Sequence, residues 1–149
     1  MADLTTTISE SVTLNGSVRG STNSLTTTGI VDVMERIVTC VQSQVTTIAT
    51  FAAAPYTSPG AIDVDRTKYI RVTNLSDTEV VDIAIVTTNT NYQVVLTAGN
   101  SHILCQADTT AIGEADTDPA FGTLENITSI EIKPRATTDA QVELFVGLI

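Results

Sequence analysis

The chain has 149 residues, of which 42% are hydrophobic, so it can fill one compact core, and a single domain is expected. Threonine, valine and isoleucine together supply 57 residues, and because β-branched side chains favour strands, the composition predicts an all-β fold. Seventeen acidic and seven basic residues give a formal charge of -10, which argues against binding nucleic acid through its phosphates.

The first 29 residues are predicted to form an extended arm. Residues 4–14 alternate in the manner of a strand, and Asn15-Gly16 is a strong hairpin signal. Residues 17–24 are polar, and we expect a loop or an irregular return there. Because the segment is rich in Thr and Ser and poor in anchoring apolar groups, it suits an arm laid on another surface. The amino terminus has neither the basic region nor the apolar run of a secretory signal, so export is not expected.

The periodicity of residues 30–41 leaves two alternatives open. Some apolar positions fit one face of a helix: Ile30, Val33, Met34, Ile37 and Val41. An overlapping set fits a strand, and the β-branched content favours a strand over residues 36–41. Residues 30–35 are left open between a strand and one helical turn.

The remainder of the chain has the spacing of a sandwich. Short apolar runs, each followed by turn residues, predict strands at 45–51, 68–74, 79–88, 92–97, 101–106, 127–133 and 141–148. This spacing is typical of sandwiches and jelly rolls. We therefore predict a single antiparallel, jelly-roll-like β-sandwich over residues 30–149, preceded by the arm of residues 1–29.

The longest interruption, residues 107–123, is acidic. Loops of this length in small domains are often contact or functional insertions. Its alternate carboxylates, and those of Asp63 and Asp65, raise the possibility of calcium. Both stretches lack the glycine turn and distal glutamate of an EF-hand loop, so a solvated acidic loop is expected instead.

The sequence offers little for catalysis. His102 is the single histidine, no nucleophile motif accompanies it, and a structural or surface role is expected. Aromatic residues make up 4% and tryptophan is absent, which argues against a glycosidase. Cys40 and Cys105 are expected to be small buried hydrophobes, with a bridge between them left open. We therefore expect no enzyme, no cofactor and no metal site.

Several stretches in order look familiar: Lys68-Tyr-Ile-Arg-Val-Thr-Asn-Leu-Ser76, Val81-Asp-Ile-Ala-Ile85, Val95-Leu-Thr-Ala-Gly-Asn-Ser-His-Ile-Leu104, Ile127-Thr-Ser-Ile-Glu-Ile132 and Ala140-Gln-Val-Glu-Leu-Phe-Val146. The series resembles small β-sandwich virion proteins of tailed bacteriophages, especially capsid decoration or cement proteins. It covers residues 68–148 and rests on the succession of strands rather than on a catalytic motif. The Thr-rich arm is similar to the arms by which virion proteins hold their neighbours.

The resemblance implies a non-enzymatic structural protein on the capsid exterior, made in the host cytoplasm. Its partners would be the major capsid protein and copies of itself, as a dimer or trimer, with neither nucleic acid nor membrane. The partner-binding residues expected in or near the arm and in the acidic loop are Leu4, Thr6, Ile8, Val12, Arg19, Arg36, Glu114, Asp116, Asp118 and Phe121. The alternatives are a tail or fibre component of the virion, or a sandwich module that binds a small ligand or glycan.

Overall fold

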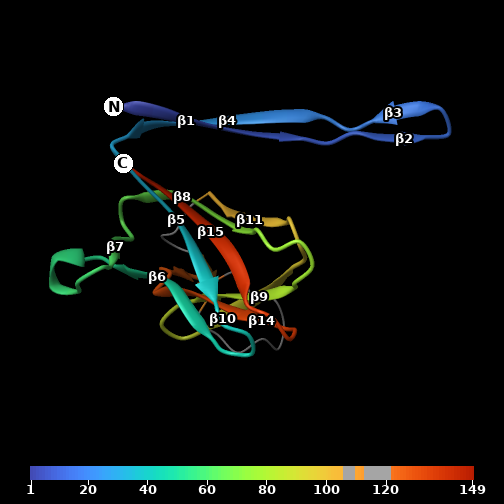
Figure 1. Ribbon diagram of the computed structural model, residues 1–149. Coiled ribbons are helices and arrows are strands. Elements are labelled where there is room, and N and C mark those ends of the chain that lie inside the picture. Colours follow the sequence, from blue (N-terminus) through green and yellow to red (C-terminus); the bar gives the residue numbers. More distant parts are fainter. Residues whose placement is uncertain (106–109, 113–121) are drawn as a thin grey trace.

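Two packed β-sheets and a projecting hairpin make up the computed structural model, which describes residues 1–105, 110–112 and 122–149 (Figure 1). The strands are β1 (Ala2–Ser9), β2 (Val12–Leu14), β3 (Ser17–Arg19), β4 (Thr22–Ile30), β5 (Asp32–Cys40), β6 (Thr46–Ala52), β7 (Ile62–Asp63), β8 (Thr67–Asn74), β9 (Val81–Val86), β10 (Asn91–Leu96), β11 (Ser101–Leu104), β12 (Ala111–Ile112), β13 (Leu124–Glu125), β14 (Ser129–Pro134) and β15 (Ala140–Leu148). One turn of 3-10 helix, η1 (Pro55–Thr57), follows β6.

The sandwich consists of a five-stranded sheet and a four-stranded sheet. The strand orders are β10-β9-β14-β6-β7 and β11-β8-β15-β5. Neighbouring strands are antiparallel except for β6 and β7, which run parallel. The chain passes repeatedly from one sheet to the other, as between β8 and β9 and between β10 and β11. The predicted all-β sandwich is therefore confirmed.

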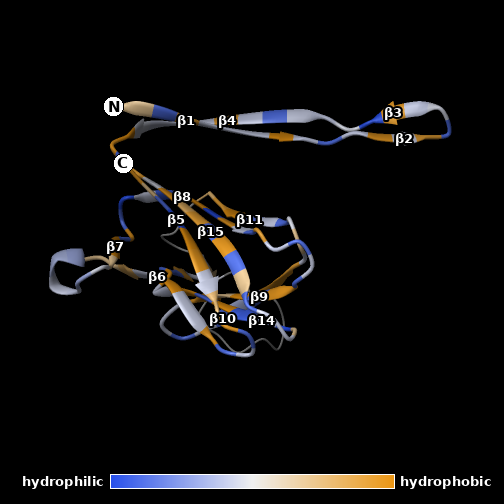
Figure 2. Cartoon of the chain, in the orientation of Figure 1, coloured by the Kyte–Doolittle hydropathy of each residue, from blue (hydrophilic) through white to orange (hydrophobic). Residues whose placement is uncertain are grey.

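Alternation along the strands builds the core. The inner face of the five-stranded sheet contributes Ile48, Ile83, Ile85, Ile130 and Ile132, and that of the four-stranded sheet contributes Ile70, Val72, Val142, Leu144 and Val146. Figure 2 shows apolar residues concentrated in the sandwich strands and spread in separate bands along the hairpin. The buried Asn74 amide donates to the main-chain oxygens of Glu79 (2.8 Å) and Leu96 (3.1 Å), so this polar group is satisfied inside the core.

The structure corrects one expected local structure and settles another that the sequence left open. Residues 17–24 are not a loop, because β3 and the start of β4 lie there and pair with β2 and β1. Asn15 (φ 51°) and Gly16 (φ 77°) form the tight turn, and main-chain pairing then holds the return strand whatever the polarity of its side chains. Residues 32–35 are strand, because β5 pairs with β15 over its whole length.

The cysteines are free, and only one of them is buried. Cys40 lies in the core, as expected, but Cys105 is exposed, so the expectation of a buried thiol there was wrong. Cys105 follows Leu104, the last residue of β11, and lies outside the strand. Burial raises the pKa of the Cys40 thiol.

The core position of Leu144 gives a direct test of the packing. Leu144→Ala should lower the free energy of unfolding by about 2–5 kcal/mol, because it leaves a cavity between the sheets. Chemical denaturation of both proteins measures the difference. As a control, Val95→Ala on the exposed side of β10 should change it by about 0.5 kcal/mol or less. Equal effects of the two substitutions would contradict this description of the core.

Candidate functional site

The most distinctive feature of the molecule is the long two-stranded projection of residues 2–30, called the hairpin below. Residues 2–15 of its outgoing half span about 45 Å at roughly 3.3 Å per residue. A compact domain of roughly 120 residues has a radius of gyration of about 14 Å, so the hairpin is longer than the sandwich is wide. Figure 1 shows the part formed by β2 and β3 reaching beyond the sandwich.

The hairpin has two chemically different faces. Thr6 of β1 lies opposite Leu25 of β4, and alternation places Leu4 and Ile8 on the same face as this pair. The other face carries hydroxyl groups, which hydrogen bond across the strands between Thr7 and Ser24 (2.9 Å) and between Ser9 and Thr22 (2.9 Å). One face thus carries the large apolar side chains with threonines and Asn23 between them, and the other is a hydroxyl ladder.

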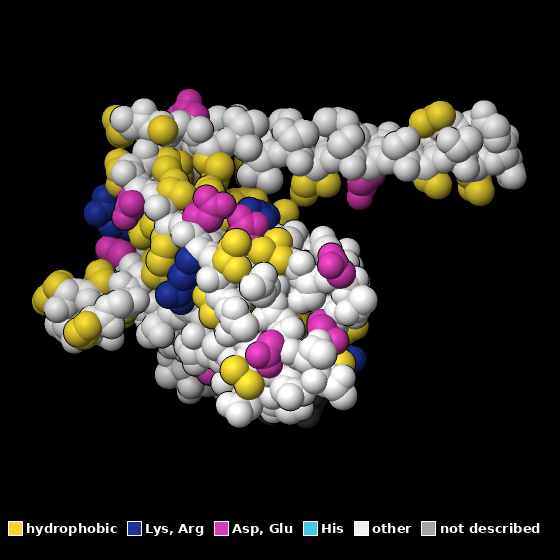
Figure 3. Space-filling view, in the orientation of Figure 1, with side chains coloured by type: hydrophobic (Ala, Val, Ile, Leu, Met, Phe, Trp, Pro, Cys, Tyr) yellow, Lys and Arg dark blue, Asp and Glu magenta, His cyan; other side chains and the backbone are white. Residues whose placement is uncertain are grey.

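The root of the hairpin is fixed to the outer face of the four-stranded sheet. A Cβ built on Gly147 of β15 would lie 3.5 Å from both Leu4 Cδ2 and Ile30 Cδ1, and 3.7 Å from Tyr69 Cβ. Ile30 and Tyr69 are each only 5% exposed. Figure 3 shows apolar side chains gathered where the hairpin meets the sandwich. The hairpin therefore leaves the sandwich in a defined direction.

Beyond the root, the large apolar side chains of the hairpin are open to solvent. Ile8 is 51% exposed and Leu25 52%, and Val12, Leu14 and Val18 near the tip are exposed as well. No third strand pairs with the hairpin in the described part of the chain. Because an isolated two-stranded hairpin is only marginally stable in water, such a surface is suited to be covered by a partner.

An open groove of about 340 Å³ separates the hairpin from the sheet below it. It is lined by Leu4, Thr5, Thr6, Thr7, Tyr69, Arg71, Ile103 and Phe145. In its floor Arg71 binds both carboxylate oxygens of Glu143, at 3.0 and 3.1 Å, and lies 5.8 Å from the centre of the Phe145 ring. Hydrogen bonds from Arg71 and from Glu35 lower the pKa of Glu143, and the bond to Glu143 raises the pKa of Glu35.

The expected partner-binding residues fall into three groups. Leu4, Thr6 and Ile8 share the apolar face, and Val12 lies directly opposite Arg19 near the tip. Arg36 is in the sandwich, where its guanidinium donates a hydrogen bond to the main-chain oxygen of Ile48. Glu114, Asp116, Asp118 and Phe121 lie outside the described residues. Sequence reasoning missed Val18, because residues 17–24 were expected to be a loop or an irregular return. It also missed Leu25, which follows that stretch and is the one large apolar residue between Val18 and Ile30.

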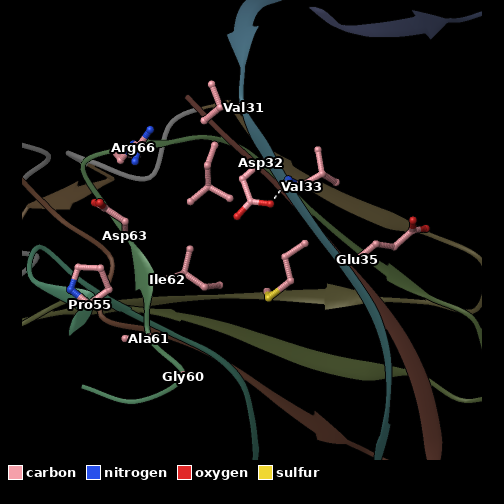
Figure 4. Close-up of a pocket in the computed structure, with 12 residues that line it drawn as sticks. Val31, Asp32, Val33, Glu35, Pro55, Gly60, Ala61, Ile62, Asp63 and Arg66 are labelled. Carbon is pink, nitrogen blue, oxygen red and sulfur yellow. Dashed lines mark hydrogen bonds between the residues drawn. The ribbon is translucent and has the colours of Figure 1, made fainter. Parts of the chain in front are cut away.

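A second hollow of about 620 Å³ lies between β5 and the segment that runs from η1 to β7. Figure 4 shows Asp32 pointing into this groove from β5, with Asp63 and Arg66 on the opposite side and Glu35 turned away. Arg66 Nε donates to the main-chain oxygen of Ile149, and the Asp32 carboxylate accepts the Val33 N–H (2.8 Å). The groove follows the outer edge of the four-stranded sheet.

The residues considered for catalysis and for metal binding make local contacts with their neighbours. His102 is half-buried, with Nε2 3.3 Å from the Tyr92 hydroxyl, and burial lowers the pKa of His102. The Asp63 carboxylate accepts the N–H of Asp65 (3.1 Å), which closes a local turn. Within the described ranges, no group of three or more His, Cys, Asp or Glu side chains could hold a metal ion.

Comparison of the chain with protein-family models, with curated proteins and with solved structures finds no match. None of the helical residues described belongs to a segment long and apolar enough to cross a membrane. The hairpin and the edge of the four-stranded sheet are therefore the features from which a function can be inferred.

Gly20 tests how the outer part of the hairpin is built. Its φ is 132°, and a Cβ there would lie 2.0 Å from the Glu10 main-chain oxygen, beside the hydrogen bond from Glu10 N–H to Ser21 O (2.9 Å). Gly20→Ala should open this part and leave the sandwich intact. Amide hydrogen exchange should show lost protection from residue 10 to residue 21. Gly29→Asn, at a positive φ with open space around it, should keep the protection, and an unchanged pattern in Gly20→Ala would contradict the geometry.

The Arg71–Glu143 pair predicts a pH dependence. The folded-state pKa of Glu143 is lowered, so the stabilisation it supplies is complete above its unfolded-state pKa and is lost as the pH falls through the folded-state pKa. Arg71→Met should move the Glu143 titration to higher pH, measured by NMR of the side-chain carboxyl. Arg135→Met, which removes the separate ion pair with Asp82 (2.7 Å), should leave that titration in place. A Glu143 midpoint unmoved by Arg71→Met would refute the assignment.

Proposed function

We propose that this chain is a non-enzymatic structural protein of a virion, a capsid decoration or cement protein that attaches to subunits of the major capsid protein. The observation that supports the proposal most directly is the hairpin, which is anchored at its root and carries an uncovered apolar face beyond it. The sandwich core does not need the outer part of this hairpin. Because the hairpin projects, it could reach a capsid subunit that the sandwich itself would not contact.

The hairpin would bind with little loss of conformational freedom. Its strands are already paired and its root is already packed, so a partner has mainly side chains to order. Each large apolar side chain that becomes fully buried contributes about 1.5–3 kcal/mol, and Ile8, Leu25 and the exposed side chains near the tip are available for this. The outer strand edges could add main-chain hydrogen bonds to a sheet of the partner.

Charge supports attachment through the hairpin rather than through the sandwich. The hairpin carries two acidic side chains and one basic one, which leaves fifteen acidic and six basic residues for the rest of the chain. The nearly neutral hairpin can approach another surface without strong repulsion, whereas the acidic sandwiches repel one another. On a symmetric shell, many such contacts made side by side would produce firm attachment from modest single affinities.

The hairpin face tests the proposal. The double variant Ile8→Glu, Leu25→Glu should bind purified empty capsids at least about tenfold more weakly than the unchanged chain, because charges would have to be buried. Cosedimentation over a range of protein concentrations measures the affinity. The matched control is Thr7→Glu, Thr26→Glu, which places the same charges in the same diagonal relation on the hydroxyl face and should bind within about twofold of the unchanged chain.

Equal binding by the apolar-face variant and the unchanged chain would refute attachment through this face. Absence of binding by the unchanged chain would refute a capsid position. Electron microscopy of complete particles carrying a labelled chain then distinguishes the capsid from a tail or fibre position, because the hairpin could serve at either place.

A further inference from the structure

The outer edge of the four-stranded sheet is long and regular. β5 has nine residues and pairs with β15 through nine consecutive residue pairs without a register shift. No strand lies on its other side in the described part of the molecule. The other terminal strands of the two sheets, β10, β11 and β7, have six, four and two residues. β5 is therefore the edge with the most main-chain groups available for a further strand.

The second half of this edge lacks the features that usually prevent strand addition. β5 contains neither lysine nor proline, and its charged side chains, Asp32, Glu35 and Arg36, all precede residue 37. The Arg36 guanidinium is turned back toward the Ile48 oxygen of the other sheet. Val33 and Ile37 lie on the outer face and are exposed, Ile37 by 62%. A long edge whose second half is uncharged and exposes apolar side chains is a surface that another strand can extend.

We propose that the edge pairs with β5 of a second copy of this chain, antiparallel about a two-fold axis at Ile37. The two four-stranded sheets would then form one continuous sheet of eight strands. Ile37 would lie opposite Ile37 of the other copy, and Val33 opposite Val41 of the other copy. Glu35 would lie opposite Thr39, so the outer face would contain no pair of like charges.

Neighbouring registers are less favourable. An axis at Arg36 would set the two Arg36 side chains against each other, and an axis at Glu35 would do the same for two carboxylates. An axis at Val38 would place Ile37 opposite Thr39 and Val33 opposite Ser43, which separates the apolar side chains. Among the axes from Glu35 to Val38, only the axis at Ile37 joins exposed apolar side chains of both strands without a clash of like charges.

Charge and the groove beside β5 also favour a second copy. Residues 37–62 contain no charged side chain, so half of the strand and the turn after it can approach an acidic copy without repulsion. In the proposed register, the uncharged turn at residues 42–44 of one copy lies near the 620 Å³ groove of the other. Exposed Val41 would come to the apolar side of that groove, which includes Val33 and Leu148.

The inference is independent of the proposed capsid function, and it adds to that function if both hold. A dimer would carry two hairpins, so one particle could engage two sites of a lattice at once. The hairpin and the β5 edge are separate surfaces, and each can be altered without the other.

Sedimentation equilibrium of the full chain tests the dimer. The unchanged chain should show twice the 15.7 kDa chain mass at micromolar concentration. Ile37→Lys alone and Ile37→Glu alone should each show the mass of one chain, because two like charges would meet on the axis. An equimolar mixture of these two variants should restore the double mass, which also requires both variants to be folded. Val95→Lys, on the exposed side of the edge strand β10, should remain dimeric.

The outcomes separate the surfaces. A single-chain mass for the unchanged protein, or a double mass for both Ile37 variants alone, would overturn the proposal. Failure of the mixture to associate would overturn the axis at Ile37. The hairpin variant Ile8→Glu, Leu25→Glu should remain dimeric, and a single-chain mass for it would overturn the assignment to β5. If this hairpin variant loses capsid binding but remains dimeric, the result bears on the proposed function and leaves the dimer proposal intact.

Discussion

The contact between the root of the hairpin and Gly147 determines what the rest of the molecule can do. Leu4 and Ile30 lie over Gly147 of β15, within van der Waals reach of a Cβ placed there, and Tyr69 closes the contact from β8. Without this packing, residues 2–30 would be an isolated two-stranded hairpin of marginal stability. With it, a threonine-rich segment becomes a projection with a fixed direction. Its apolar face is then held in one orientation relative to the sandwich.

The four-stranded sheet has two roles that the five-stranded sheet does not share. Its inner face completes the core, while its outer face holds the hairpin root and the Arg71–Glu143 pair, and its β5 edge is open. The ion pair lies in the groove under the hairpin, beside Phe145, where a lone charge would be costly. Pairing lets this floor carry a cation and a carboxylate next to apolar side chains without attracting water strongly. The surfaces proposed for binding are thus supported by one rigid sheet.

The sequence predicted the sandwich strands well because their alternation reports directly on two packed faces. It failed over residues 17–24, where the return strand is held by main-chain pairing to β1 and β2 and its side chains hardly alternate in polarity. Leu25, just after this stretch, was missed because it is the one large apolar residue between Val18 and Ile30 and so shows no alternation. The open edge could not be predicted at all, because strand order is a property of the folded sheet. Arg36 was expected in or near the arm. It lies in this edge strand, and its guanidinium donates a hydrogen bond to the Ile48 main-chain oxygen of β6. This contact also depends on how the strands are arranged in the folded protein.

The distribution of charge limits how copies of this chain can meet one another or a lattice. With a formal charge of -10, two randomly oriented copies repel, and contact is easiest where charged side chains are absent. Three such regions exist in the sequence: most of the hairpin, residues 37–62, which include the second half of β5, and residues 83–107, which include β10 and β11. The first two expose several large apolar side chains, whereas β10 and β11 expose Val95 alone and are shorter edges than β5. Repulsion between the acidic surfaces would therefore favour association through uncharged regions, and the length and exposed apolar side chains of the hairpin and of β5 favour these two.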